Sequence, residues 1–188
     1  MLSEDKRIKS KQQLQEFLEL EYKRFPLRGR RYISYLLQLS EGAILRKHTK
    51  LLRYTEYHLN CGHKLRGAIY WARLMRLQNK YGMHVPINCF DKGLTIYHLS
   101  PIVVNGKVSV GKNCTLMPNT NIVTDHKGSP TPVLGDNVFL GIGSSVVGNV
   151  YLADGITVGA GAVVTKSFYE PGVHIAGVPA KIIEKRGE

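Results

Sequence analysis

The chain has 188 residues, which at about 100–200 residues per domain makes one ordinary domain, or one with a small appendage, and excludes a large multidomain machine. Apolar residues make up 43% and charged residues 21%, a globular composition that excludes wholesale disorder and collagen. No stretch approaches the ~18 consecutive apolar residues of a membrane span. The N-terminus is charged where a secretory signal is apolar, so we expect a cytoplasmic protein.

The net charge of +12 is concentrated in the N-terminal half. Residues 1–82 hold 18 Lys and Arg against 7 Asp and Glu, a balance of +11, and residues 83–188 hold 8 against 7, a balance of +1. A basic half can meet nucleic acid, an anionic membrane surface or an acidic polymer. These charges are dispersed between apolar positions, which is typical of solvated helix faces, and we expect no nucleic-acid partner.

Three cysteines are present, Cys61, Cys89 and Cys114, and no C-x-x-C pair. An odd number without close spacing predicts reduced thiols that are at least partly buried. No residues have the spacing of a metal site, so we expect no metal.

The N-terminal half predicts a small helical domain of about three helices over residues 1–82. Apolar residues recur at helical spacing in a first segment around Leu14. A Leu- and Tyr-rich segment follows from Tyr32 to Leu59, after a break at Pro26 and Gly29. We expect Cys61-Gly62 to end the second helix and Tyr81-Gly82 the third. The apolar positions of the third helix are Leu65, Ala68, Ile69, Ala72, Met75 and Leu77.

After residue 82 the period changes to six. Six residues rotate an α-helix by about 600°, so a helix cannot keep such a repeat on one face, whereas a coil with three short strands can. The repeat predicts a parallel β-helix of triangular cross-section over residues 83–168, with about four coils and an incomplete one in front. The twelve large apolar residues that carry the repeat, and that we expect to point inward, are Phe90, Ile96, Val104, Val110, Leu116, Ile122, Leu134, Leu140, Val146, Leu152, Val158 and Val164.

Two interruptions break the repeat, and each has a histidine beside it. The step from Ile96 to Val104 is eight, which places two extra residues near His98. The step from Ile122 to Leu134 is twelve, which predicts an extruded loop after His126. We expect the helical domain to cap the front of the coil, and residues 169–188 to cover its back with a short helix.

Several segments carry a resemblance to a known family, over residues 79–186. The segment with the family's catalytic histidine is matched by residues 80–82, 92–94, His98, 102–106 and 110–114. Residues 134–141 resemble its next repeat, and residues 176–181 its closing tail. The chain thus resembles the hexapeptide-repeat acyltransferases with left-handed β-helices, and within them the serine O-acetyltransferase-like group, which includes capsule-biosynthesis members. The resemblance implies an α+β fold, acetyl-CoA as co-substrate, and a homotrimer, or a hexamer formed through the helical domain.

By the same resemblance, His98 is the general base that takes a proton from the acceptor hydroxyl. The arm of acetyl-CoA would lie against backbone with small side chains, because a large one would block it. The residues that the resemblance assigns to acetyl-CoA are Gly141, Ile142, Ala160 and Gly161 along the arm, and Thr165, Lys166 and Lys181 at the nucleotide end.

The chain also departs from the serine enzymes. Tyr97 and Met83 stand where they usually have the aspartates that orient the histidine, and Pro130-Thr131 stands where they hold the serine carboxylate with an Arg-His pair. A backbone carbonyl or Asn105 is the expected substitute for the missing aspartates. These departures support a first alternative to serine, a sugar O-acetyltransferase of capsule or envelope polysaccharide synthesis.

Two further alternatives stay open. Asp125 and His126 precede the extruded loop, and with Asn105 they are candidates for the acceptor site, His126 also for an alternative base. A non-catalytic β-helical scaffold with a basic docking domain is the second alternative function. The leading hypothesis is acetyl transfer from acetyl-CoA to a small-molecule hydroxyl, in L-serine or a sugar.

Overall fold

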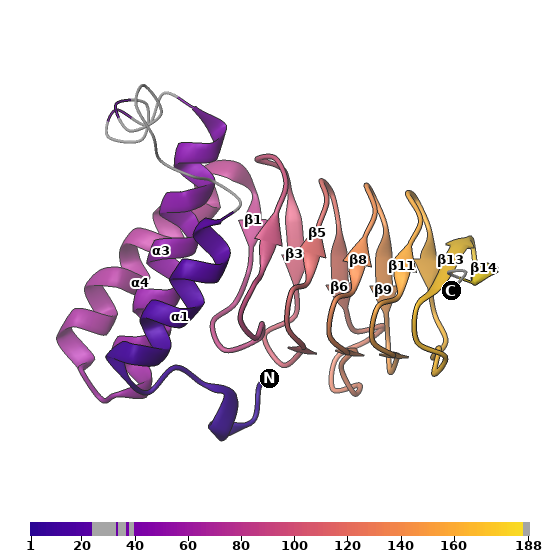
Figure 1. Cartoon of the computed structure of the whole chain (residues 1–188), viewed down its shortest axis with the longest axis horizontal. Coiled ribbons are helices and arrows are strands. Elements are labelled where there is room, and N and C mark those ends of the chain that lie inside the picture. The colour runs from indigo at the N-terminus through magenta and orange to yellow at the C-terminus, as the bar shows by residue number, and fades with distance from the viewer. Residues whose placement is uncertain (24–32, 34–36, 38–39, 186–188) are drawn as a thin grey trace.

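The computed structural model describes residues 1–23, 33, 37 and 40–185, and it places a helical cap on one end of a coil of parallel strands (Figure 1). The predicted break at Pro26 and Gly29 and the predicted helix start at Tyr32 lie outside the described residues. Within the described ranges, no helix combines the length and apolarity needed to cross a bilayer.

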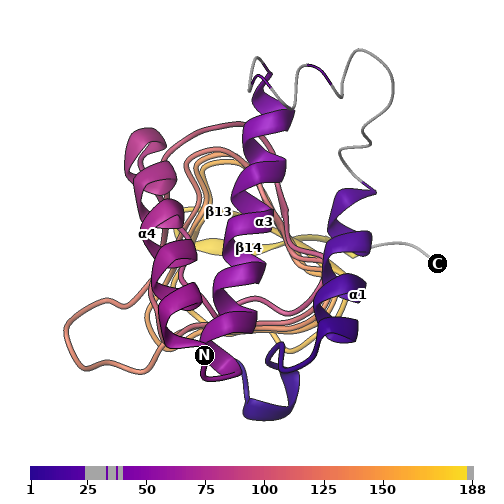
Figure 2. The same ribbon diagram turned by 90° about the vertical axis from the view of Figure 1, so that its left-hand side faces the viewer.

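The cap consists of η1 (Glu4–Lys6), α1 (Lys11–Tyr22), α3 (Glu41–Asn60) and α4 (Lys64–Tyr81). The side chains of Ser10 and Ser40 begin α1 and α3, because each accepts a hydrogen bond from a backbone N–H three residues further on. Gly82 ends α4 in the left-handed conformation. The predicted ends of the second and third helices are confirmed. Figure 2 shows the three α-helices across the end of the coil, with α3 between α1 and α4.

The apolar face predicted for α4 is correct only at its C-terminal end, where Leu77 is buried and Met75 packs against the core. Its C-terminal half packs on the coil through Leu74 and Leu77, which are buried. Helical spacing shows that an apolar stripe exists, but not which of two stripes on one helix meets the core. The residues that lie on the surface instead, here called the α4 stripe, are Leu65, Ala68, Ile69 and Ala72.

The coil is built from short strands stacked on three sides. Side A has the order β1-β3-β6-β9-β12, side B β4-β7-β10, and side C β2-β5-β8-β11-β13-β14. All pairs are parallel except β13 with β14. The strands are β1 (Met83–His84), β2 (Thr95–Ile96), β3 (Ile102–Val104), β4 (Ser109–Val110), β5 (Thr115–Leu116), β6 (Asn121–Val123), β7 (Val133–Leu134), β8 (Phe139–Leu140), β9 (Ser145–Val147), β10 (Tyr151–Leu152), β11 (Thr157–Val158), β12 (Val163–Val164), β13 (Val173–Gly177) and β14 (Ala180–Lys185).

The repeat predicts the interior of the coil correctly. All twelve residues of the hexad series are buried, and the most exposed of them, Ile96, has an exposure of 5%. The extruded loop is confirmed as well: the chain between β6 and β7 has no regular structure and projects sideways from the coil (Figure 2).

The expected helix at the C-terminus is wrong, because β13 and β14 form an antiparallel hairpin on the last coil. The hairpin buries Ile175 and Ala180. A strand at this place pairs with the backbone groups that the edge of side C would otherwise leave open, and a helix cannot do that.

One apolar core runs from the cap into the first coil, joining residues such as Leu52 and Leu74 to Val85. Beside it, the fully buried Arg53 of α3 donates hydrogen bonds to Glu21 of α1 at 2.6 Å and to Glu56 at 2.8 Å. The same guanidinium donates to the carbonyl of Phe90 at 2.9 Å. Arg53 therefore ties two helices to the coil.

Candidate active site

His98 lies at the corner where the chain passes from side C to side A, between β2 and β3. Its φ of 66° is in the left-handed region, which is uncommon for a residue other than glycine. The two extra residues of this corner hold the imidazole outside the coil, where 62% of the side chain is exposed. The corners above it stack in register, so they form one column, here called the His98 edge: residues 97–101, 117–120, 141–144, 159–162 and 176–179.

A carboxylate from the cap faces the imidazole. Nδ1 of His98 lies 3.0 Å from Oε2 of Glu41, the first residue of α3, and Oε1 of the same carboxylate accepts a hydrogen bond from the backbone N–H of Leu99. Glu41 therefore takes the place predicted from the sequence for a backbone carbonyl or Asn105. Asn105, the expected substitute, turns instead to the backbone N–H of Lys107.

Glu41 is held in its ionised form. The hydrogen bond from the Leu99 N–H, followed by that from His98, lowers the pKa of Glu41 below its ordinary value. The position in the first turn of α3 also favours a negative charge, because the positive end of the helix dipole lies there. With Nδ1–H donating to this carboxylate, Nε2 of His98 has a free lone pair and can accept a proton.

Four of the residues assigned to acetyl-CoA lie on the His98 edge. Gly141 and Ile142 follow β8, and Ala160 and Gly161 follow β11. A Cβ on Gly141 would lie 2.7 Å from the carbonyl oxygen of Val158, so only glycine fits there. A Cβ on Gly161 would meet nothing within 4 Å, and half of the Ile142 side chain is exposed. This part of the edge is therefore open, with backbone close to the surface.

The tail residue Lys181 pairs with Ala176, next to the top of the His98 edge. Four steps separate the corner of His98 from the corner after β13, which at ~4.8 Å per step is about 19 Å. Thr165 and Lys166 lie elsewhere, at the corner that follows β12, and the Lys166 ammonium lies over the ring of Phe168.

The second histidine lies on another edge. Asp125 and His126 follow β6, and Asn105 follows β3, so all three lie where side A passes to side B. Nδ1 of His126 lies 3.1 Å from Oδ1 of Asp125, and both side chains are more than half exposed. Within one chain, the structure does not bring these residues together with His98.

No three His, Cys, Asp or Glu side chains of the described residues form a group that could hold a metal ion. The cysteines are free, with Cys89 and Cys114 buried and Cys61 half-buried. Burial raises the pKa of Cys114 to about 12, so that this thiol stays protonated.

Comparison with known proteins finds relatives that share the six-residue repeat. Residues 131–166 match the family model described as bacterial transferase hexapeptide, six repeats. A serine acetyltransferase of Buchnera aphidicola subsp. Schizaphis graminum is 31% identical over 105 residues, 53% of this chain and 39% of that protein. The serine acetyltransferase of Synechococcus elongatus is 28% identical over 118 residues, 62% of this chain and 48% of that protein. The chain resembles the serine acetyltransferases. It spans less than half the length of these two relatives.

Solved structures of serine acetyltransferases have the same fold, a helical cap followed by a left-handed parallel β-helix. The enzyme from Brucella abortus strain S19 aligns with a TM-score of 0.67 at 22% identity, over 94% of this chain and 69% of that one. The same enzyme in complex with coenzyme A has a TM-score of 0.66 at 23% identity, over 94% and 68%. The Neisseria gonorrhoeae serine acetyltransferase in complex with serine has a TM-score of 0.67 at 21% identity, over 93% and 71%.

Sequence reasoning missed Glu41, which is 57 residues from His98. The only signal was an N-terminal helix signature, a serine followed by a glutamate at Ser40-Glu41, and it predicts a helix start and not a contact.

Proposed function

We propose that this chain is an acetyl-CoA-dependent O-acetyltransferase in which His98 is the general base. The hydrogen-bonded pair of Glu41 and His98, at the foot of an open edge of small residues, is the observation that carries the proposal. The similarity of the chain to serine acetyltransferases, one of them solved in complex with coenzyme A, supports the same reaction.

The chemistry follows from the pair. Nε2 of His98 takes the proton of the acceptor hydroxyl while the hydroxyl oxygen attacks the thioester carbonyl. The carboxylate of Glu41 stabilises the imidazolium that forms, and keeps the ring in the tautomer whose Nε2 is free. When the tetrahedral intermediate collapses, the C–S bond breaks, and the imidazolium returns the proton to the departing sulfur. The acetyl group passes directly to the acceptor, without an acetyl-enzyme.

The acetyl-CoA arm would follow the His98 edge past Gly141, Ile142, Ala160 and Gly161, with Lys181 near the phosphates. The stacking of these residues in one column supports this path. Thr165 and Lys166 lie at a different corner, so they would reach the nucleotide only from a neighbouring subunit.

Exposed apolar surface supports an oligomer in which neighbouring subunits contribute to one site. Exposed apolar side chains on the coil, among them Val103, Val133 and Tyr151, favour a homotrimer packed side to side. The α4 stripe favours a further contact between caps, which would give a hexamer. His126 and Asp125 of a neighbouring subunit would then be candidates for the acceptor site. We also retain the cytoplasm as the predicted compartment.

A second acceptor class is favoured by a specific observation. Lys47, Arg73, Arg76 and Lys80 line a groove between α3 and α4, at the end of α4 that reaches the first coil. Gly82, which follows, packs on Pro101, three residues beyond His98. A basic groove near His98 fits an acidic or phosphorylated sugar better than free serine. We propose a sugar hydroxyl as the alternative acceptor.

The test is release of coenzyme A from acetyl-CoA, first with L-serine and then with a panel of sugars and nucleotide sugars. Wild type is compared with His98→Ala and His126→Ala. Turnover with one acceptor that His98→Ala reduces about 10²–10⁴-fold supports the proposal. Loss in His126→Ala alone makes His126 the base, and no release with any acceptor favours the scaffold alternative, which strongly salt-dependent binding to polyanions would support.

A further inference from the structure

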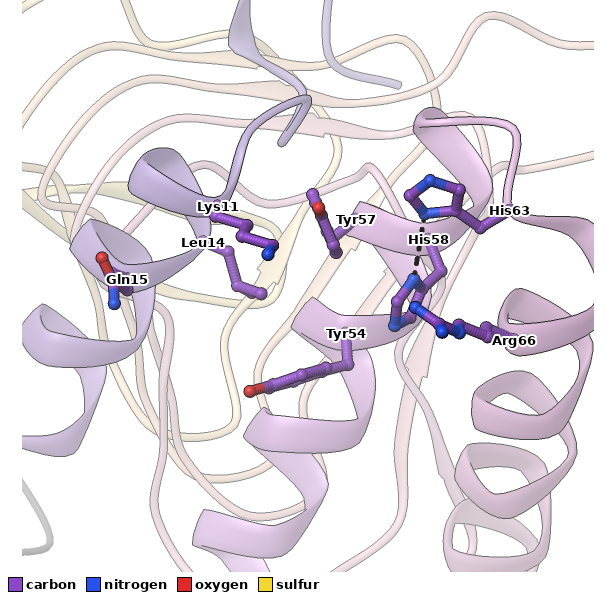
Figure 3. A pocket seen from close by; sticks show the side chains of 8 residues that line it. All are labelled: Lys11, Leu14, Gln15, Tyr54, Tyr57, His58, His63 and Arg66. Atoms are coloured by element: carbon purple, nitrogen blue, oxygen red, sulfur yellow. Dashed lines mark hydrogen bonds between the residues drawn. The ribbon is translucent and has the colours of Figure 1, made fainter.

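A cavity of about 630 Å³ lies on the cap, over the C-terminal half of α3 and between α1 and α4 (Figure 3). Tyr54 of α3 lies thirteen residues beyond Glu41, so along the helix the cavity is about 20 Å from the Glu41 contact with His98. The reaction proposed above does not use it. The residues that line the cavity are Lys11, Leu14, Gln15, Tyr54, Tyr57, His58, His63 and Arg66.

The lining is positively charged, and none of the described residues that form it is a carboxylate. Figure 3 shows Lys11 entering from α1 and Arg66 from α4, on either side of Tyr57 and His58. Neither cation forms a salt bridge with a described residue. Two uncompensated positive charges around one cavity attract a negatively charged ligand.

Two histidines of the lining lie within hydrogen-bond distance of each other. Nδ1 of His58 lies 3.2 Å from Nδ1 of His63, so one ring donates to the other and both cannot carry a proton there without repulsion. Partial burial and the nearby His63 and Arg66 lower the pKa of His58. An anion bound beside His58 would offset these effects, so that His58 could take up a proton.

Aromatic rings form the other part of the wall. The rings of Tyr57 and His58 lie 5.0 Å apart, and Tyr54 and His58 stack on Tyr70 of α4 at 5.1 and 5.2 Å. This packing holds the rings in place, and a flat apolar group can lie on such a surface. The groups that face His58 are Tyr54 and Tyr57 of its own helix, His63 of the turn, and Arg66 and Tyr70 of α4, with Lys11 of α1 across the cavity.

We propose that this cavity binds a phosphate monoester whose organic part is a flat ring. A monoester carries close to two negative charges at neutral pH, which match those of Lys11 and Arg66. The histidine pair donates to the phosphate oxygens, and the ring lies against Tyr54 and Tyr57. A carboxylate brings one charge only, and a metal cation would be repelled by Lys11 and Arg66.

The proposal is tested by calorimetric titration of the full-length protein with phenyl phosphate, inorganic phosphate and benzoate. We expect phenyl phosphate to bind most tightly. Lys11→Gln and Arg66→Gln each weaken its binding about 10- to 100-fold, as expected for a charged hydrogen bond. Lys112→Gln is the matched control, because Lys112 is an exposed lysine of the coil, at the corner after β4, and lines neither this cavity nor the basic groove.

Titrations in buffers of different ionisation enthalpy, at about pH 7.5, measure protons taken up on binding, at a pH where the monoester is already a dianion. We expect net uptake in wild type and none in His58→Asn. If His58→Asn does not fold, the ring proton resonances of His58 and His63 in wild type report the same uptake. Acetyl transfer by Arg66→Gln should stay at the wild-type rate, which separates this site from the proposed reaction.

Four results would overturn the proposal: no binding of phenyl phosphate at millimolar concentration, equal affinity for inorganic phosphate, an equal loss in Lys112→Gln, or no proton uptake in wild type.

Discussion

Replacing Glu41 by alanine removes the carboxylate that faces His98 and leaves the coil unchanged. The expected result is slower acetyl transfer, because the imidazolium loses its stabilising partner and the ring its fixed tautomer. Glu41→Gln tests the tautomer separately. Its amide can turn an NH₂ group toward Nδ1, which favours a proton on Nε2, so we expect a loss at least as large as in Glu41→Ala.

The magnitude follows from the geometry. A hydrogen bond to a charged group contributes about 1.5–3 kcal/mol. Because 62% of His98 and 42% of Glu41 are exposed, solvent weakens their 3.0 Å contact, and the low end applies, about 1.5 kcal/mol. At about 1.4 kcal/mol per factor of ten, kcat/KM falls about tenfold.

The assay is kcat/KM for coenzyme A release as a function of pH, with the acceptor found in the panel. Glu19→Gln, an exposed carboxylate of α1, is the control and should match wild type. In a His98→Ala background, Glu41→Ala should cost nothing more, because Glu41 acts through His98. An unchanged kcat/KM in Glu41→Ala would refute this reasoning, as would the same tenfold loss with and without His98.

Three further predictions concern stability, measured by urea unfolding. Arg53→Ala should lower the free energy of unfolding by about 3–5 kcal/mol, since the buried Glu21 carboxylate loses its partner. A loss below about 1 kcal/mol would contradict the conclusion that Arg53 holds the helices on the coil. Gly141→Ala should cost about 1–3 kcal/mol, because its Cβ would meet the Val158 carbonyl at 2.7 Å, and a neutral result would mean that the coil opens there. Burial lowers the pKa of His48 to about 4, so between about pH 6.5 and pH 4 the unfolded chain binds a proton at His48 that the folded chain does not. The free energy of unfolding should therefore fall with decreasing pH across this window, by about 3 kcal/mol in total. In His48→Gln the fall should be much smaller.

The period of six made the coil predictable from the sequence, because each hexad repeats the same local environment. Val104, Val158 and the other residues of the series needed only their spacing to be placed inside. His98 was also accessible to sequence reasoning, since it stands where the repeat is broken.

Contacts between the cap and the coil were not predictable, because no local pattern records them. Glu41 meets His98 only after α3 docks across the first coil, and Arg53 is a charged residue whose burial depends on partners from α1 and the coil. The prediction of a C-terminal helix failed for a similar reason. Residues 180–185 form a strand because an unpaired edge is next to them, and the family-like motif before them does not specify that edge.

Because the corners of the His98 edge are stacked, the number of turns in the coil fixes the length of this edge. Each turn adds ~4.8 Å between the histidine and the closing hairpin, and nothing else in the fold changes when a turn is added. Three extra hexads inserted between β9 and β12 would lengthen the edge by one step. If the acetyl-CoA arm follows this edge as proposed, the number of repeats sets the distance that the arm spans, independently of the chemistry at His98.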